Sequence, residues 1–74
     1  MISLGSNLRE LNLHGTDLSG ANLSSANLSE ARILETLLIA ANLTKADLRG
    51  SLIIAAETTR AKLEGIQLEE GRSL

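Results

Sequence analysis

The sequence lacks cysteine, proline, tryptophan, tyrosine and phenylalanine in all of its 74 residues. Without cysteine the chain has no disulfides and no thiolate chemistry, and a single histidine argues against a dedicated metal site. Nine acidic and seven basic residues give a net charge of −2, which excludes the basic surface typical of nucleic-acid-binding proteins. The longest apolar runs, such as residues 37–41, are far shorter than the roughly 20 residues that cross a bilayer.

The first ten residues, MISLGSNLRE, lack the charged start and apolar run of a secretory signal. With no signal and no membrane segment, we expect a cytoplasmic location by default. A chain of this length forms one domain, and a core of this size rarely contributes more than about 3–5 kcal/mol. Stability must therefore come from a regular arrangement.

That regularity is a five-residue repeat that runs from Ser6 to Glu70. The first position is mostly small and the second is mostly Asn or Asp, as in Ala26-Asn27 and Ala46-Asp47. The third position is Leu or Ile in nearly every repeat, and Thr58 is the exception. The resulting core ladder comprises Leu8, Leu13, Leu18, Leu23, Leu28, Ile33, Leu38, Leu43, Leu48, Ile53, Leu63 and Leu68.

A period of five fits neither an α-helix nor a flat strand. Five residues advance about 500° on a helix, so the leucines would spiral around it. On a strand, side chains alternate between faces, so successive leucines would point to opposite sides. The leucines share one interior only if the chain bends at each repeat. The first and third positions then point inward, and the fifth forms a corner where glycine would tolerate a positive φ, as at Gly15 and Gly50.

These tandem A-[DN]-L-x-x units, among them ANLSS, ANLSE, ANLTK and ADLRG, resemble the pentapeptide repeat family. The resemblance implies an all-β fold, a right-handed quadrilateral parallel β-helix in which four repeats make one square coil. Twenty residues per coil give about three and a quarter coils of this solenoid. The chain is then a single pentapeptide-repeat domain over residues 1–74, with repeats at 6–70 and short flanking ends.

Several outward positions carry apolar residues, which indicates a binding surface. Stacking residue n over n+20 places Leu34 over Ile54, with Leu52 on the same face. Leu37 and Ile39 follow on the adjacent face. We interpret these five residues as a candidate interface, and a homodimer is its simplest form because two-fold pairs dominate soluble oligomers. The alternative is local drift of the pattern, covered by a terminal segment.

The two ends of the solenoid also need cover. Large residues occupy the small first position at Leu11 and Ile66, in the first and last coils, where we expect them to fill the ends. We expect Met1, Ile2 and Leu4 to fold over the first coil. At the other end, the charges of Glu69, Glu70 and Arg72 are expected to discourage edge pairing, and Leu74 to act as a minor plug or to begin a further contact. End-to-end stacking, or a chain that is one segment of a longer repeat protein, are the alternatives to pairing by a face.

No residue pattern predicts catalysis, a cofactor or a metal. His14, Asp17 and Ser19 lie close in sequence, but on a convex rod they point to solvent without a pocket or an oxyanion site. Glu10 and Glu30 stack at equivalent corners, which we interpret as a solvated edge. We therefore expect no enzyme activity, no cofactor and no small-molecule substrate.

The function that this pattern favours is a structural or protein–protein interaction module that associates with itself or with another protein, without direct contact to nucleic acid or membrane. The resemblance implies an alternative, since some family members mimic DNA and modulate DNA gyrase or topoisomerase. Duplex DNA carries one charge per ~1.7 Å, so a rod of ~15 Å would need ~9 negative charges. The net charge of −2 falls well short of that density.

Overall fold

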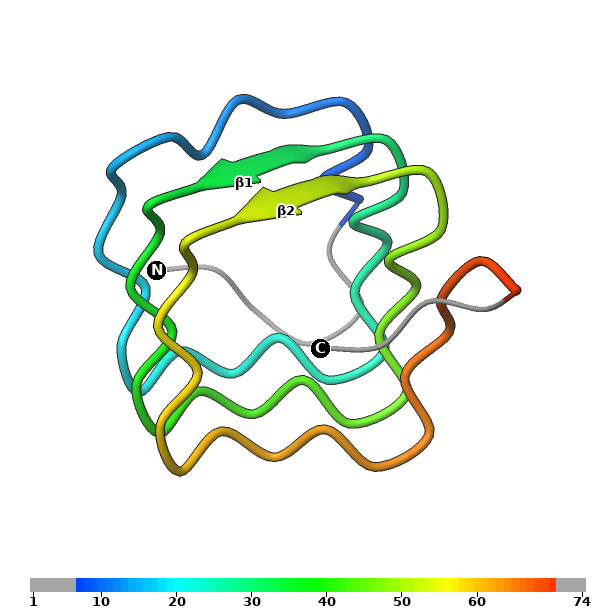
Figure 1. Cartoon of the computed structure of the whole chain (residues 1–74). Helices are drawn as coiled ribbons and strands as arrows, with labels where there is room; N and C mark the ends of the chain where they lie inside the picture. The colour runs from blue at the N-terminus through cyan, green and yellow to red at the C-terminus, as the bar shows by residue number, and fades with distance from the viewer. Residues whose placement is uncertain (1–6, 71–74) are drawn as a thin grey trace.

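The computed structural model describes residues 7–70, and within this range it holds strands and bridges but no helix. Its two regular strands are β1 (Arg32–Leu34) and β2 (Leu52–Ile54), which pair in parallel and lie side by side (Figure 1). The all-β class predicted from the sequence is confirmed. The residues expected to cover the two ends, namely Met1, Ile2, Leu4, Arg72 and Leu74, lie outside the described range.

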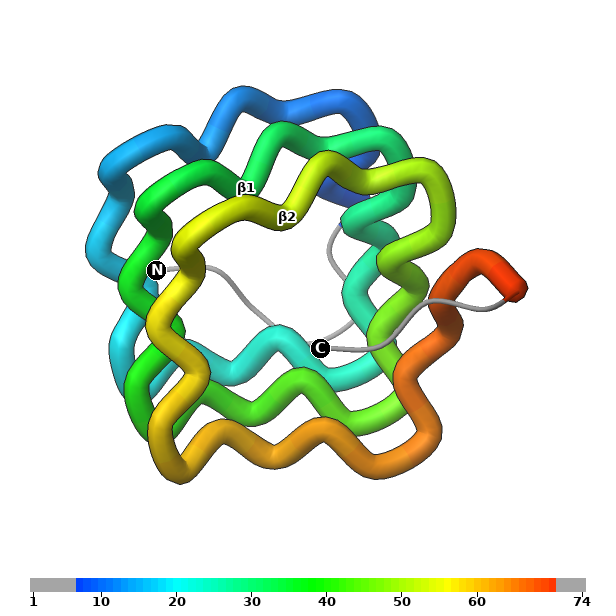
Figure 2. Tube along the Cα trace, viewed as in Figure 1, coloured from blue at the N-terminus to red at the C-terminus, as the bar shows by residue number. Residues whose placement is uncertain are grey.

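The chain winds as a square spiral, and Figure 2 shows its four sides. Single parallel bridges join residues that are twenty apart, for example Asn7 with Asn27 and Asn22 with Asn42. This offset confirms the quadrilateral arrangement and the stacking of residue n over n+20. We name the sides face A (7–10, 26–30, 46–50, 66–70), face B (11–15, 31–35, 51–55), face C (16–20, 36–40, 56–60) and face D (21–25, 41–45, 61–65).

The first and third positions of each repeat point inward and fill a narrow core. The small first-position residues Ala26, Ala31, Ala41 and Ala46 are fully buried. The buried third-position residues are Leu13, Leu23, Leu28, Ile33, Leu38, Leu43 and Leu48, and those that are partly buried toward the two ends are Leu8, Leu18, Ile53, Leu63 and Leu68. Small and large residues therefore alternate across one interior, which allows the close packing of a protein core.

Two buried first-position residues carry hydroxyl groups, and both hydroxyls donate hydrogen bonds. Thr36 Oγ1 donates to the Leu13 carbonyl at 2.7 Å, and Ser51 Oγ donates to the Leu48 carbonyl at 2.6 Å. Neither side chain leaves a buried polar atom unsatisfied. The large first-position residues differ from each other: Ile66 packs against the core, but Leu11 remains 43% exposed, so it fills its end only in part.

The fifth position of the repeats forms the corner, and from Glu10 to Gly65 φ is positive there with or without glycine. Gly15 has φ of 70°, and the non-glycine corners include Glu10 at 66° and Ala40 at 59°. A left-handed conformation costs a non-glycine residue roughly 1–2 kcal/mol. Hydrogen bonds to the next turn offset this cost, since the Glu10 N–H donates to the Ser29 carbonyl at 3.0 Å and the Ala40 N–H to the Thr59 carbonyl at 2.8 Å.

Where the second position is Asn or Asp, its side chain supports the bend from outside. Its Oδ1 accepts a hydrogen bond from the backbone N–H two residues later, as between Asn27 and Ser29 at 3.0 Å or Asp17 and Ser19 at 3.0 Å. Such Asx turns compete with a continuous strand ladder. β1 and β2 have Arg32 and Leu52 at this position and pair over three residues, although Leu37 and Glu57, which also lack such a side chain, are joined by a single bridge.

Candidate interaction surface

The pair of strands on face B presents an apolar outer surface. Leu34 and Ile54 are aligned partners in the ladder, and Leu52 is aligned with Arg32. Leu52 and Ile54 are 41% and 52% exposed, and Leu34 is half-buried. We call the side chains of Leu34, Leu52 and Ile54, on two stacked rungs, the face B patch. An exposed apolar cluster on strand residues is a feature of protein interfaces.

The two remaining residues of the candidate interface, Leu37 and Ile39, lie around the corner at Glu35, on face C. Both are half-buried. Leu37 bridges Asp17 on one side and Glu57 on the other, so carboxylates stand on the rungs above and below it. Face C thus has one apolar rung between acidic neighbours, whereas face B has apolar residues on two consecutive rungs.

Polar and charged side chains border the Leu34 rung of the face B patch. His14 Nε2 lies 2.9 Å from Glu35 Oε1 on the next turn of the solenoid. The sequence predicted that His14 points to solvent. Its contact with Glu35 was not predicted, because stacking by twenty residues places His14 over Leu34, and Glu35 is the next residue, at the corner. Arg32 stands on the same rung as Leu34 and takes part in no ion pair within residues 7–70.

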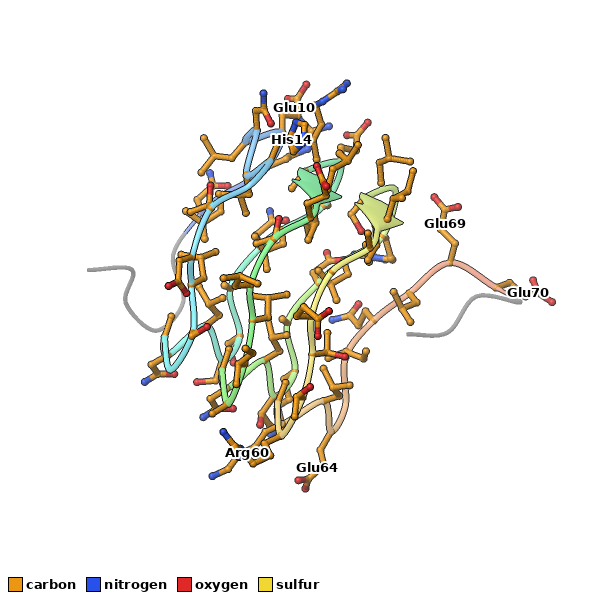
Figure 3. The ribbon with its side chains drawn as sticks, turned by 60° about the vertical axis from the view of Figure 1, so that its left-hand side comes forward. Glu10, His14, Arg60, Glu64, Glu69 and Glu70 are labelled. Atoms are coloured by element: carbon orange, nitrogen blue, oxygen red, sulfur yellow. The ribbon has the colours of Figure 1, made fainter. Side chains whose placement is uncertain are left out.

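The hydrolase-like set of His14, Asp17 and Ser19 does not assemble into a catalytic arrangement. Asp17 accepts from the Ser19 backbone on face C, and His14 contacts Glu35 at the edge of face B. Figure 3 shows His14 pointing away from the solenoid. The interior cavity holds only about 10 Å³ between the core leucines, less than a substrate needs.

The corner between faces A and B carries the other charged cluster. The Arg9 guanidinium contacts both Glu10 and Glu30. Arg49 binds the two carboxylate oxygens of Asp47 at 2.9 and 2.8 Å. Within residues 7–70, no group of three or more His, Cys, Asp or Glu side chains is placed to hold a metal ion. Over the same range no helix is long and apolar enough to cross a bilayer.

Two aspartates give the fold a dependence on pH. The side-chain hydrogen bond from Arg49 lowers the pKa of Asp47, and the Ser19 backbone N–H and hydroxyl lower the pKa of Asp17. A carboxyl whose pKa is lower in the folded state stabilises that state above its unfolded pKa. The contribution is then lost as the pH falls through the lowered folded pKa.

We therefore expect the free energy of unfolding to be constant near neutral pH and to decrease below about pH 4. Urea denaturation followed by circular dichroism from pH 6 to pH 2.5 measures this. Asp47→Asn is the matched variant, because asparagine is the usual second-position residue and keeps the turn. It should lose stability less steeply with acid, and an unchanged slope would contradict the assignment to Asp47.

Known proteins resemble this chain in sequence and in structure. The family described as "Pentapeptide repeats (8 copies)" matches residues 5–33 and 17–53. No curated protein gives a significant match. A pentapeptide repeat protein, Rfr23, from the cyanobacterium Cyanothece 51142 is similar over 86% of this chain, with 38% identity and a TM-score of 0.84.

Two structures from Nostoc PCC 7120 are also similar. The pentapeptide repeat protein alr5209 matches 88% of this chain with 38% identity and a TM-score of 0.61. HetL, a pentapeptide repeat protein involved in heterocyst differentiation regulation, matches 95% with 28% identity and a TM-score of 0.62. The chain spans 44% of Rfr23, 59% of alr5209 and 35% of HetL. Repeat pattern, square solenoid and these likenesses agree: the chain belongs to the pentapeptide repeat family.

Proposed function

We propose that this chain is a non-enzymatic protein-interaction module whose rigid solenoid pairs with a second copy through face B. The observation that carries the proposal is the face B patch, in which Leu52 and Ile54 expose 41% and 52% of their surface on a regular strand. Burial of apolar surface contributes about 25 cal/mol per Å², so covering this patch favours association.

The rest of the molecule supports a role in binding. The interior is filled by leucines and has no room for a substrate. Regulation of differentiation, the role given to HetL, is a task that a binding surface performs without catalysis. The acidic side chains do not favour DNA mimicry, because Arg9 contacts Glu10 and Glu30 and Arg49 contacts Asp47.

The experiment is the solution mass of the chain by light scattering after size exclusion, across a tenfold concentration range. A refractive-index detector is required because the chain has no tryptophan or tyrosine. We expect the wild type to become dimeric as its concentration rises. The variant Leu52→Asp/Ile54→Asp should remain a folded monomer, because it places two charges where the partner's apolar side chains would pack.

Leu37→Asp is the control on the adjacent face, since it adds one negative charge at a half-buried leucine on face C, between Asp17 and Glu57. It should leave the dimer intact, and its loss of dimerisation would extend the interface around the corner. A wild-type chain that is monomeric throughout the range would exclude self-association. Dimerisation of the double-Asp variant at the wild-type concentration would exclude face B.

A further inference from the structure

The proposed pairing through face B leaves open how the two copies are oriented, and the charges beside the patch answer this. Arg32 lies at one edge of face B, next to face A, and Glu35 forms the corner at the other edge. Both belong to the same rung as Leu34. The face B patch is thus flanked by a cation on one side and an anion on the other.

We propose that the two copies pair about a two-fold axis parallel to the solenoid axis, with Arg32 of each copy contacting the partner's Glu35. This inference rests on the proposed self-association. A rotation of 180° about that axis keeps each rung at its height and reverses the strand direction. The second position of one copy then faces the fourth position of the other.

This arrangement is self-complementary on both apolar rungs. Leu52 faces the partner's Ile54, and Ile54 faces the partner's Leu52, so the two most exposed apolar side chains of the strands cover each other. On the neighbouring rung, the Arg32 stem packs over the partner's Leu34 and its guanidinium reaches the partner's Glu35. His14 contacts Glu35 through Oε1, which leaves Oε2 to accept the arginine.

Charge favours face B over face C for this pairing. Under the same two-fold rotation, Asp17 of face C would face the partner's Ser19, and Glu57 would face the partner's Thr59. Glu57 then reaches the partner's Arg60, as Arg32 reaches Glu35, but the corner of the Asp17 rung is Gly20, so Asp17 meets no cation. Burying the Asp17 carboxylate without a charged partner is costly, so this rung of face C opposes a contact that face B allows.

The area of face B is also sufficient for a specific interface. A four-sided rod has four sides and two ends, so one side is roughly a sixth of the accessible surface of 4393 Å². Face-to-face pairing therefore buries up to roughly 700 Å² per copy, near the roughly 800 Å² per partner of standard interfaces.

The test exchanges the two charges between separate chains. Arg32→Glu is compatible with the fold because Glu57 occupies the same repeat position on face C, and Glu35→Arg because Arg60 is a corner with φ of 58°. Each single variant creates two like-charge contacts in its homodimer. We expect the dissociation constant of each homodimer to rise roughly tenfold.

An equimolar mixture of Arg32→Glu and Glu35→Arg should restore dimers at the wild-type concentration. In the heterodimer the introduced carboxylate of one chain meets the introduced guanidinium of the other, and the second contact keeps its native pair of Arg32 and Glu35. Native mass spectrometry separates these heterodimers from either homodimer by mass. Rescue in the mixture requires contact between chains, since a pair formed within one chain would be broken in both variants. Circular dichroism confirms that each variant is folded.

Two negative results have different meanings. If the wild type dimerises and Leu52→Asp/Ile54→Asp prevents it, but mixing gives heterodimers only in statistical proportion, the two-fold orientation is wrong and the interaction through face B stands. If the wild type is monomeric at every concentration, self-association and this orientation both fail.

Discussion

Leu28→Ala should lower the free energy of unfolding by about 2–5 kcal/mol, the range for a leucine removed from a rigid core. Leu28 is 1% exposed and lies in the column of Leu8, Leu48 and Leu68. The neighbouring turns hold its backbone through bridges at Asn27, so the surrounding chain cannot collapse into the space. Because a domain of this size has only a few kcal/mol of stability, we expect the variant to be largely unfolded at room temperature.

Circular dichroism with urea denaturation measures this loss. Leu68→Ala is the matched control in the same column, since Leu68 is only partly buried, and it should cost less than half as much. Equal losses of unfolding free energy at the two positions would show that the coil around Leu68 is packed as tightly as the coil around Leu28.

Ala31→Leu is the second large effect, and it acts by overfilling the core. The Ala31 side chain is fully buried in a column with Leu11 on one side and Ser51 on the other. A leucine there adds three carbon atoms to an interior whose free volume is about 10 Å³. Overpacking of a close-packed core costs typically about 1–3 kcal/mol, and the stacked backbone of a solenoid has no independent way to shift. We expect a loss near the upper end of that range.

The same urea experiment tests this prediction, and Leu11, in the same column as Ala31, supplies the control variant. Leucine is the native residue one turn earlier, where Leu11 is 43% exposed. Leu11→Ala should therefore change the free energy of unfolding by less than about 1 kcal/mol. If Ala31→Leu were neutral, the small residues of the first position would not be set by the width of the core.

The sequence was sufficient to predict the side-chain directions and the stacking. An odd period forces a bend at each repeat, and four repeats per coil place Asn7 beside Asn27, as observed. The positive φ of non-glycine corners such as Ala40 and Lys45 was not predicted. At Ala40 and Lys45 the N–H bonds to the next turn hold this conformation, whereas local residue preference alone would favour glycine.

The sequence predicted which outward residues stack on each other, but not which polar and charged side chains contact each other. The positions of Leu34 and Ile54 followed from the offset of twenty. The contact between His14 and Glu35 did not, because it depends on where two side chains extend beyond the backbone register. Likewise the repeat places Thr36 at the mostly small first position, but its donation to the Leu13 carbonyl requires knowledge of which carbonyl faces the core.

The constant offset of twenty residues also determines how this chain must fold. Each bond between turns joins residues 19 or 21 apart, as from Leu8 to Asn27 and from Arg32 to Leu11, so no repeat has a partner until a full loop has closed. Closing that first loop costs roughly 3 kcal/mol of chain entropy. Each later repeat docks on a turn that already exists and orders only five residues. The slow step is therefore the formation of one complete turn, after which the solenoid grows repeat by repeat from that template.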